Sequence, residues 1–507
     1  MIFRVPVVIN NLSSKNKLKK MKRHNLSFII LLSSLLVFVA CNDDSLFTSK
    51  VSVSGGYTIV SKIRPGGLEM ALGLRMRLIT KLKINDTIDS RDFKTMRDEM
   101  PNLQVLDLSN AVIASYNGYE GTGFNSVYRY SANSIPEFAF YNQKTSVGKA
   151  GLQTIILPNS IRSIRDYAFN STGISGELII PASVKDTIGK SAFSFCENLT
   201  GIAISGAKLI GESAFQGCVN LTGNLVFPDS VITIHPWAFA NCEKISTIEI
   251  PESLTEIGLS AFNACGGLFN VSTTNLNFSS ADGVLFNADK STLIQFPKSK
   301  SGVYNVPATV SSIGPWAFAN NDKLTGIQLP PTTSVIEDYA FYNCVSLSGN
   351  FPISSSMWYI GQQVFEGCLG ISGFTVAADN MIFTYTNGVL NDISQFTLKR
   401  CIPSKSGSFI VDANILFIDN SAFSNCVKLN SISFPESLLD ISKRAFFNCS
   451  GLTNIYVKNP VPIDLISALS AFEGVDKANC TLHVPLGTKT AYSNAIGWKD
   501  FVNIVEN

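Results

Sequence analysis

The sequence predicts a mainly β solenoid, built from short strands and turns with little helix, and its internal repetition supports this. An Ala-Phe step recurs at a nearly constant interval along the chain, except at two longer gaps, before Phe318 and before Phe423. A unit this short cannot bury its apolar face alone, so the copies must stack into one continuous core. The repeated phenylalanines are Phe140, Phe169, Phe193, Phe215, Phe239, Phe262, Phe318, Phe341, Phe423, Phe446 and Phe472, with Val364-Phe365 as a variant.

Residues 238–262 show what one repeat contains. Ile248 and Ile250 alternate with Thr247 and Glu249, which predicts a short strand with one buried face. Pro251 follows at once and ends the strand, because proline cannot donate to a sheet ladder. Stacked copies of this strand would form a parallel sheet, and the repeat period lies within the range of leucine-rich repeats.

The two long gaps contain related text, at residues 282–307 and 387–412. Both stretches carry a Gly-Val-Leu sequence and a later Ser-Lys-Ser-Gly sequence. We interpret them as degenerate repeats with additional strand-forming runs, not as inserted domains.

The repeated phrase AFxxCxxLxxIxIPxSVxxIG resembles the BspA-like leucine-rich repeats of surface proteins from Bacteroides-type bacteria. The phrase occurs at residues 192–204, 214–234, 238–258, 317–336, 340–352 and 422–441. The resemblance covers residues 132–479 and implies a right-handed leucine-rich-repeat superhelix. It also implies adhesion or protein binding, with host matrix proteins or other bacteria as partners. Residues 480–507 resemble the C-terminal cap of such proteins.

Residues 55–131 differ from the repeats and are expected to form an N-terminal cap with one helix. Apolar residues at helical spacing from Ser90 to Met100 predict that helix, with Asp89 or Ser90 as its N-cap. Leu82 and Ile84 predict a strand before it. A conventional leucine-rich repeat follows, in which the L-x-x-L-x-L pattern comprises Leu103, Leu106 and Leu108.

The start of the chain is predicted to be a signal peptide over residues 1–40, although translation could begin at Met21. A basic stretch precedes an apolar run at 26–40, which is short for a membrane span and typical of a signal peptide. Val39-Ala40-Cys41 resembles a bacterial lipobox, so we expect Cys41 to be lipidated, with residues 41–54 as a polar tether. No later run is long enough to span a membrane, so the lipid would be the only membrane contact.

We expect the mature chain to be an outer-membrane lipoprotein exposed at the cell surface. The residues that follow Cys41, Asn42-Asp43-Asp44, resemble the acidic export tag of surface lipoproteins in Bacteroides-type bacteria. Two alternatives stay open. The chain could be a glycan-binding surface module for nutrient capture, or a scaffold that faces the periplasm.

Eight of the eleven cysteines lie three residues after the motif phenylalanine or its Phe365 variant. Structural zinc sites need Cys or His pairs two to four residues apart, which this spacing does not supply. Disulfides between neighbouring repeats are geometrically allowed. Other repeats, however, place Gln143, Thr172, Asn321 or Val475 at this position, so we favour buried thiols that fill a packing site. The eight are Cys196, Cys218, Cys242, Cys265, Cys344, Cys368, Cys426 and Cys449.

The sequence predicts no enzyme, no cofactor and no metal. It has only three histidines, His24, His235 and His483, and no nucleophile, zinc-protease, phosphate-loop or dinucleotide motif. From residue 41 onward there are 33 basic and 38 acidic residues, a net charge of −5. This charge gives no basic stripe for nucleic acid.

The candidate binding residues are therefore surface positions that would contact a protein or glycan ligand. One set is expected on the exposed face of the strands: Thr247, Glu249, Gln328 and Tyr456. The other set comprises the aromatic residues that directly precede an Ala-Phe step: Tyr167, Trp237, Trp316 and Tyr339. Aromatic side chains often anchor ligands, but these could equally pack between turns.

Overall fold

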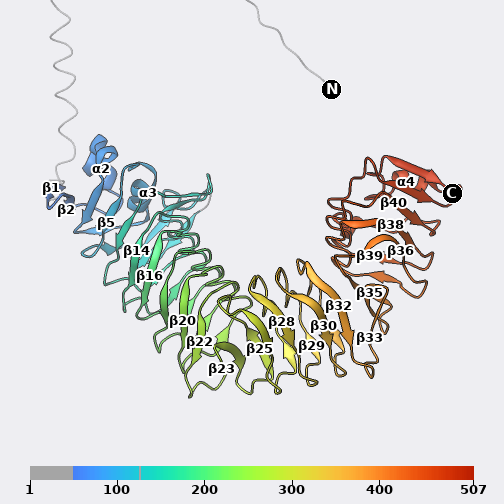
Figure 1. Cartoon of the computed structure of the whole chain (residues 1–507). Coiled ribbons are helices and arrows are strands. Elements are labelled where there is room, and N and C mark those ends of the chain that lie inside the picture. Colours follow the sequence, from blue (N-terminus) through green and yellow to red (C-terminus); the bar gives the residue numbers. More distant parts are fainter. Residues whose placement is uncertain (1–48, 125–126) are drawn as a thin grey trace, which may run out of the picture. The chain divides into compact units, whose positions relative to one another are not determined.

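A computed structural model describes residues 49–124 and 127–507, which form a β-solenoid whose turns follow the order of the sequence (Figure 1). Residues 49–507 belong to one compact unit. The predicted signal peptide, the possible start at Met21 and the predicted lipidation site at Cys41 lie outside the described residues. The prediction of a mainly β solenoid with little helix is confirmed.

Regular turns each contribute a two-residue strand whose second residue is an isoleucine facing the core. These strands pair in parallel within three separate ladders. The first comprises β9 (Ser134–Ile135), β13 (Ser163–Ile164), β15 (Thr187–Ile188), β17 (Leu209–Ile210), β19 (Thr233–Ile234) and β21 (Glu256–Ile257). The second contains β25 (Thr292–Gln295), β27 (Ser312–Ile313), β29 (Val335–Ile336) and β31 (Tyr359–Ile360), and the third contains β35 (Thr397–Cys401), β37 (Phe417–Ile418) and β39 (Asp440–Ile441).

Most turns also contribute a longer strand on a second face. In β20 (Ile245–Ile250), Ile248 and Ile250 are buried and Thr247 and Glu249 are half-buried, so the predicted alternation is confirmed. The longer strands pair in parallel in four sheets: β14 (Gly176–Ile180) with β16 (Leu199–Ile204); β18 (Gly223–Val226) with β20 and β22 (Leu268–Val271); β26 (Gly302–Asn305) with β28 (Leu324–Gln328); and β30 (Ser348–Ile353) with β32 (Gly370–Val376). A fifth, C-terminal sheet contains β36 (Ser406–Ile410), β38 (Lys428–Phe434), β40 (Asn454–Val457), β41 (Thr481–Val484) and β42 (Asn503–Glu506).

The motif phenylalanines form a stack of rings along the core. The Phe169 and Phe193 centroids lie 5.1 Å apart and their planes differ by 6°. The amide of Phe193 donates to the carbonyl oxygen of Ala214 in the next turn, at 2.8 Å. An Ala-Phe step of a regular stacked turn therefore supplies an aromatic ring to the core, and in most turns it also supplies a main-chain hydrogen bond to the next turn.

The ten cysteines within the described residues are all buried and free, so the packing prediction is confirmed over disulfides. The thiol also hydrogen-bonds: Sγ of Cys196 donates to the carbonyl oxygen of Phe169, one turn earlier, at 3.1 Å. Thr172 occupies the cysteine position of its own turn, and its hydroxyl donates to the same carbonyl at 2.8 Å. Cys196 and Thr172 thus fill the same position with a small side chain that satisfies a buried carbonyl.

Two interruptions break this regular pattern, at residues 272–311 and 377–416; we call them the first and second interruption. Each begins with an antiparallel hairpin, β23 (Phe278–Ala281) with β24 (Val284–Asn287), and β33 (Phe383–Thr386) with β34 (Val389–Asp392). Each interruption also holds one turn of the solenoid, in which Phe296 or Cys401 occupies the position of the motif phenylalanine. The amide of Phe296 donates to the carbonyl oxygen of Ala317 at 2.8 Å, and the amide of Cys401 donates to that of Ala422 at 2.7 Å. The interpretation as degenerate repeats with extra strands agrees with this arrangement, and the apolar core divides into three clusters at the interruptions.

The N-terminal region combines a sheet with helices. The sheet contains β1 (Lys50–Ser54), β2 (Tyr57–Ser61), β3 (Lys81–Ile84), β5 (Val105–Asp107) and β12 (Thr154–Ile156). The predicted helix is confirmed as α3 (Ser90–Asp98), in which Asp89 and Asp92 form a capping box. The expectation of one helix was wrong, because α2 (Leu68–Leu72) and a 3-10 turn, η1 (Gly73–Leu78), precede α3. So short a helix shows no helical period in its sequence.

Small strand pairs complete the region: β4 (Thr87–Ile88) with β6 (Val112–Ile113), β7 (Tyr116–Gly118) with β8 (Tyr128–Tyr130), and β10 (Tyr141–Asn142) with β11 (Val147–Gly148).

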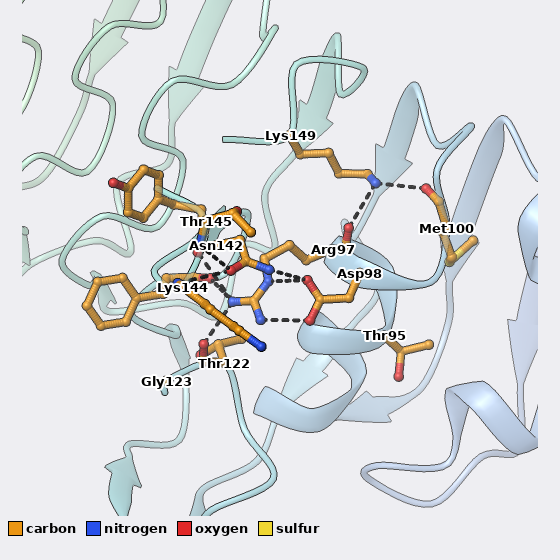
Figure 2. A network of polar contacts seen from close by, with 12 residues as sticks. Thr95, Arg97, Asp98, Met100, Thr122, Gly123, Asn142, Lys144, Thr145 and Lys149 are labelled. Atoms are coloured by element: carbon orange, nitrogen blue, oxygen red, sulfur yellow. Dashed lines mark hydrogen bonds and ion pairs between the residues drawn. The ribbon is translucent and has the colours of Figure 1, made fainter. Parts of the chain in front are cut away.

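Polar contacts join α3 to the first repeats (Figure 2). The Arg97 guanidinium pairs with Asp98 at 2.7 Å and donates to the carbonyl oxygen of Phe138 at 2.8 Å. Lys149 donates to the carbonyl oxygens of Arg97 and Met100 at the C-terminal end of α3, at 3.2 and 2.8 Å. Burial lowers the pKa of the Lys149 ammonium. These side chains fix the helix against the start of the stack.

At the other end, residues 480–507 cover the last ring of the phenylalanine stack. Trp498 is buried, lies 5.3 Å from the Phe472 ring and donates its indole N–H to Ile463 at 2.8 Å. The segment includes α4 (Lys489–Asn494), and a 3-10 turn, η2 (Ile466–Ala468), precedes it. None of the helices that the structure describes is long and apolar enough to span a membrane. The domain boundaries given above stay predictions.

Candidate binding surfaces

Each regular turn carries a ridge, which we define as the four residues between the strand isoleucine and the motif phenylalanine. The third ridge residue, the one before Ala-Phe, has a φ between 50° and 60° although it is not glycine. Such a left-handed conformation is unfavourable for most residues and persists where neighbouring structure holds it. In most turns its amide donates to the next ridge, as the Tyr167 amide does to the carbonyl oxygen of Lys190 at 2.8 Å.

The structure brings three of the four predicted ridge aromatics together. Trp237 and Trp316 lie 5.2 Å apart at an angle of 76°, and Trp316 stacks on Tyr339 at 4.3 Å. Tyr342, which was not among the predicted residues, completes the cluster at 5.5 Å from Trp316. Tyr167 lies apart, stacked on Phe138 at 5.5 Å. All four predicted aromatics are half-buried, so part of each ring is available to a ligand.

The strand-face residues do not form one site, because they lie in three different sheets. Thr247 and Glu249 are on β20, and Glu249 accepts a hydrogen bond from Asn270 at 2.6 Å. Thr247 is less exposed than expected, and its buried hydroxyl oxygen has no partner among the described residues. Gln328 is exposed at the end of β28.

Tyr456, the fourth strand-face residue, lies on β40 beside a hollow of about 380 Å³. Its ring stacks on His483 at 4.2 Å, and the imidazole of His483 hydrogen-bonds to Asn454 and Asn507 at 3.0 and 2.8 Å. No sequence pattern indicated that His483 would meet Tyr456, since the two belong to different segments and the cap fold decides their pairing. The set of binding residues stays a prediction.

Burial keeps most of the ladder thiols protonated. It raises the pKa of Cys196 to about 11 and that of Cys265 to about 12. A cysteine nucleophile must be a thiolate, so these two thiols are inert at neutral pH. Cys426 differs, because its contact with the Cys401 side chain lowers its pKa and raises that of Cys401. Both of these side chains are nevertheless buried, so the pair presents no nucleophile at the surface.

The described residues also lack a metal site. Within residues 49–124 and 127–507, no group of three or more His, Cys, Asp or Glu side chains is placed to hold a metal ion.

The repeats identify the family. A family model for the BspA type leucine rich repeat region matches the chain over residues 113–223, 208–306, 303–386 and 391–478, in six copies. These matches cover more than half of the chain, which therefore belongs to the BspA-type leucine-rich-repeat family, as the repeated phrase predicted. Repeat proteins of this type are generally binding scaffolds, and leucine-rich-repeat proteins generally bind other proteins.

Several solved bacterial leucine-rich-repeat proteins are similar to the chain. One from Eubacterium ventriosum is 18% identical, with 84% of this chain and 93% of that chain covered and a TM-score of 0.39. A leucine-rich cell surface protein from Faecalibacterium prausnitzii is 20% identical, with 81% and 93% covered and a TM-score of 0.43. One from Bacteroides ovatus is 18% identical, with 81% and 92% covered and a TM-score of 0.37. No curated protein matches the chain. Because these TM-scores are low, the assignment rests on the matched repeats.

Proposed function

We propose that this chain is a cell-surface lipoprotein that binds other proteins and mediates adhesion. Lipid on Cys41 would hold it in the outer membrane, and the solenoid would present its surface to host matrix proteins or other bacteria. The observation that carries the proposal is the BspA-type repeat match across residues 113–478. The lipobox-like Val39-Ala40-Cys41 and the acidic residues after it support the location.

A binding role, not catalysis, agrees with the side chains on the surface. The cysteines of the described residues are all buried, and burial holds thiols such as Cys196 and Cys265 in the protonated form. The chain after the predicted signal peptide is nearly balanced in charge, which favours neutral or mixed contacts over nucleic acid. We therefore propose that the protein is not an enzyme and needs no cofactor.

Protein ligands are favoured over glycans by the packing of the aromatic cluster. Glycan-binding aromatics need free ring faces, whereas Trp316 and Tyr339 stack on each other at 4.3 Å. Trp237 meets Trp316 edge to face. The rings thus partly cover one another, which leaves less free ring face for a sugar and favours an apolar contact with a protein partner.

The proposed location can be tested by treating intact cells with an external protease. A periplasmic protein serves as the control for leakage, and the released chain must itself be shown to be protease-sensitive. Loss of the chain from intact cells supports surface exposure. Protection of a protease-sensitive chain would contradict the adhesion proposal and favour the scaffold that faces the periplasm.

The lipid anchor needs a separate experiment. Cys41→Ser should release the chain into the soluble fraction and abolish its labelling by a radioactive or clickable fatty acid. A Cys196→Ser chain is the matched control, because its thiol lies in the buried ladder and should leave labelling unchanged. Fatty-acid labelling that persists in the Cys41→Ser chain would contradict the anchor.

A further inference from the structure

The first interruption lacks part of a ridge. Leu293 on β25 pairs with Ile313, and Phe296 donates to Ala317 as a motif phenylalanine does. Only Ile294 and Gln295 separate Leu293 from Phe296, whereas a regular ridge has four residues. The solenoid is therefore two residues short at this point on its surface.

A cavity of about 290 Å³ occupies the place of the missing residues. Its walls come from the preceding ridge, from β25 and from the following ridge. They include Leu259, Ser260, Leu285, Ile294, Gln295 and Pro315. No charged side chain lines this cavity among the described residues. At roughly 30 Å³ for each water molecule, the space equals about ten waters, close to the lower size of ligand-binding sites.

The cavity exposes main-chain groups that regular turns pair with each other. In a regular turn, the amide of Trp237 donates to the carbonyl oxygen of Leu259 at 3.2 Å, and the amide of Phe239 donates to that of Ala261 at 2.7 Å. The corresponding amides of Ser260 and Phe262 have no acceptor anywhere in the described chain. Buried amides without a partner are rare and costly, so this wall favours a ligand with acceptor oxygens.

The opposite wall offers an acceptor. The carbonyl oxygen of Pro315 receives no hydrogen bond from the described residues, whereas that of Pro236, at the equivalent position, accepts from Ser213 at 3.0 Å. Ser260 adds a buried hydroxyl, 6% exposed, that has no partner in the part of the chain the structure describes. Donors on one wall and an acceptor on the other match the two sides of a peptide group.

We propose that this cavity binds a short extended segment of a partner protein, about two uncharged residues long, whose main chain takes the place of the missing ridge. The inference rests on the proposed protein-binding function and names its site and the chemistry of its ligand. The segment's carbonyls accept from Ser260 and Phe262, and its amide donates to Pro315. Apolar side chains of the segment contact Leu259, Leu285 and Ile294.

The probe is the capped peptide acetyl-Gly-Leu-Ser-Ala-amide, which copies ridge residues 258–261. Its binding to the purified chain is measured by ligand-observed NMR titration. We expect saturable binding in the millimolar range. N-methylation of the serine amide removes one hydrogen bond and should weaken binding about 2- to 10-fold. Acetyl-Gly-Lys-Glu-Ala-amide should not bind, because the cavity has no charge to pair with it.

Two single variants and one double variant locate the binding. Leu259→Lys places a charge at the mouth, on a side chain that is 47% exposed, so the chain should fold and lose peptide binding. Leu439→Lys is the matched control, since Leu439 is 60% exposed on another turn, and should bind normally. The double change Asn263→Glu and Gln295→Arg copies the second interruption, so it should fill the cavity and prevent binding.

The absence of saturable binding below about 10 mM would overturn the inference. Equal binding by the Leu259→Lys chain or by the N-methylated peptide would also overturn it, because the site would lie elsewhere or use no main-chain pairing. These results are independent of the protease experiment. If the chain binds the peptide but is protected from protease in intact cells, its partner lies inside the envelope. If the chain is exposed at the surface but binds no peptide, it contacts its partner through another face.

Discussion

The two interruptions have the same main-chain design but opposite interiors. Each replaces a four-residue ridge by two residues, Ile294-Gln295 in the first and Lys399-Arg400 in the second. The first encloses about 290 Å³, and the second only about 10 Å³. The same shortened turn thus leaves a neutral cavity in one place and a filled one in the other.

Charged side chains account for the filled interior. Arg400 donates to the carbonyl oxygen of Ser421 at 2.6 Å, and Lys399 pairs with Asp419. Glu366, only 4% exposed, accepts from Ser421 at 2.7 Å and pairs with Arg444 at 2.7 Å. The equivalent positions of the first interruption are all uncharged. Gln295 replaces Arg400, and Ile294 replaces Lys399. Gly314, Asn263 and Tyr339 stand in place of Asp419, Glu366 and Arg444, respectively. The charged side chains, together with Gln363 in place of the small Ser260, therefore separate the filled ridge gap from the one that stays open.

The largest expected effect comes from Glu366→Gln. Removing this buried charge weakens the contacts of Glu366 with Arg444, Ser421 and Gln363 together, and each charge-assisted hydrogen bond is worth about 1.5 to 3 kcal/mol. The thermal midpoint, followed by circular dichroism, should fall clearly. Asn263→Ala, at the equivalent position of the first interruption, should cost less, because Asn263 mainly accepts one neutral hydrogen bond from Asn320 at 2.9 Å. Equal losses in the two variants would contradict the comparison.

An intermediate effect is expected for Arg400→Gln, which gives the second interruption the residue of the first. The variant loses a charge-assisted hydrogen bond to Ser421, worth about 1.5 to 3 kcal/mol. Gln295→Met should cost only about 0.5 to 1.5 kcal/mol, since the lost bonds from the Gln295 amide are neutral and long, at 3.3 Å. Urea midpoints of both chains provide the measurement. A larger loss of stability for Gln295→Met than for Arg400→Gln would contradict the conclusion that charged contacts fill only the second interruption.

The last effect depends on pH, is near zero at about pH 8, and contrasts the interruptions with a regular turn. Burial raises the pKa of Cys196 to about 11, above the value near 8.5 of an exposed thiol. The folded chain holds this proton more tightly, so the thiol's contribution to stability is complete below about pH 8.5 and is lost as the pH rises towards about 11. Cys196→Thr, which copies the residue at Thr172, has no titrating group here. The thermal midpoint of the natural chain should therefore fall relative to that of the variant as the pH rises from about 8 to about 10.5. A difference in midpoint that stays constant over this range would contradict the raised pKa of the buried thiol.

Much of the architecture followed from the sequence because the repeat makes every signal recur. The position of Phe239 in its phrase predicted a buried ring, the alternation around Ile248 predicted a strand, and the replacement of cysteine by Thr172 predicted a packing thiol. The helix at Ser90 was predictable from its cap and apolar spacing. These are local patterns, and local patterns are what a sequence records directly.

The candidate site was not predictable in the same way. Trp237 and Trp316 meet across Ser260 and the shortened ridge. The shortening is not apparent from the sequence until Phe296 is recognised as a motif phenylalanine that lacks the preceding alanine. Similarly, the unpaired amide of Ser260 depends on a neighbouring turn that lacks the matching carbonyl. Such features arise from the register between turns, which one sequence does not state.

The most direct test of this account is a crystal structure of the chain with acetyl-Gly-Leu-Ser-Ala-amide. We expect the peptide main chain in the cavity between Ser260 and Pro315, with hydrogen bonds to both, and no peptide beside Arg400. A peptide bound at the second interruption, or a first interruption closed by its own side chains, would contradict it.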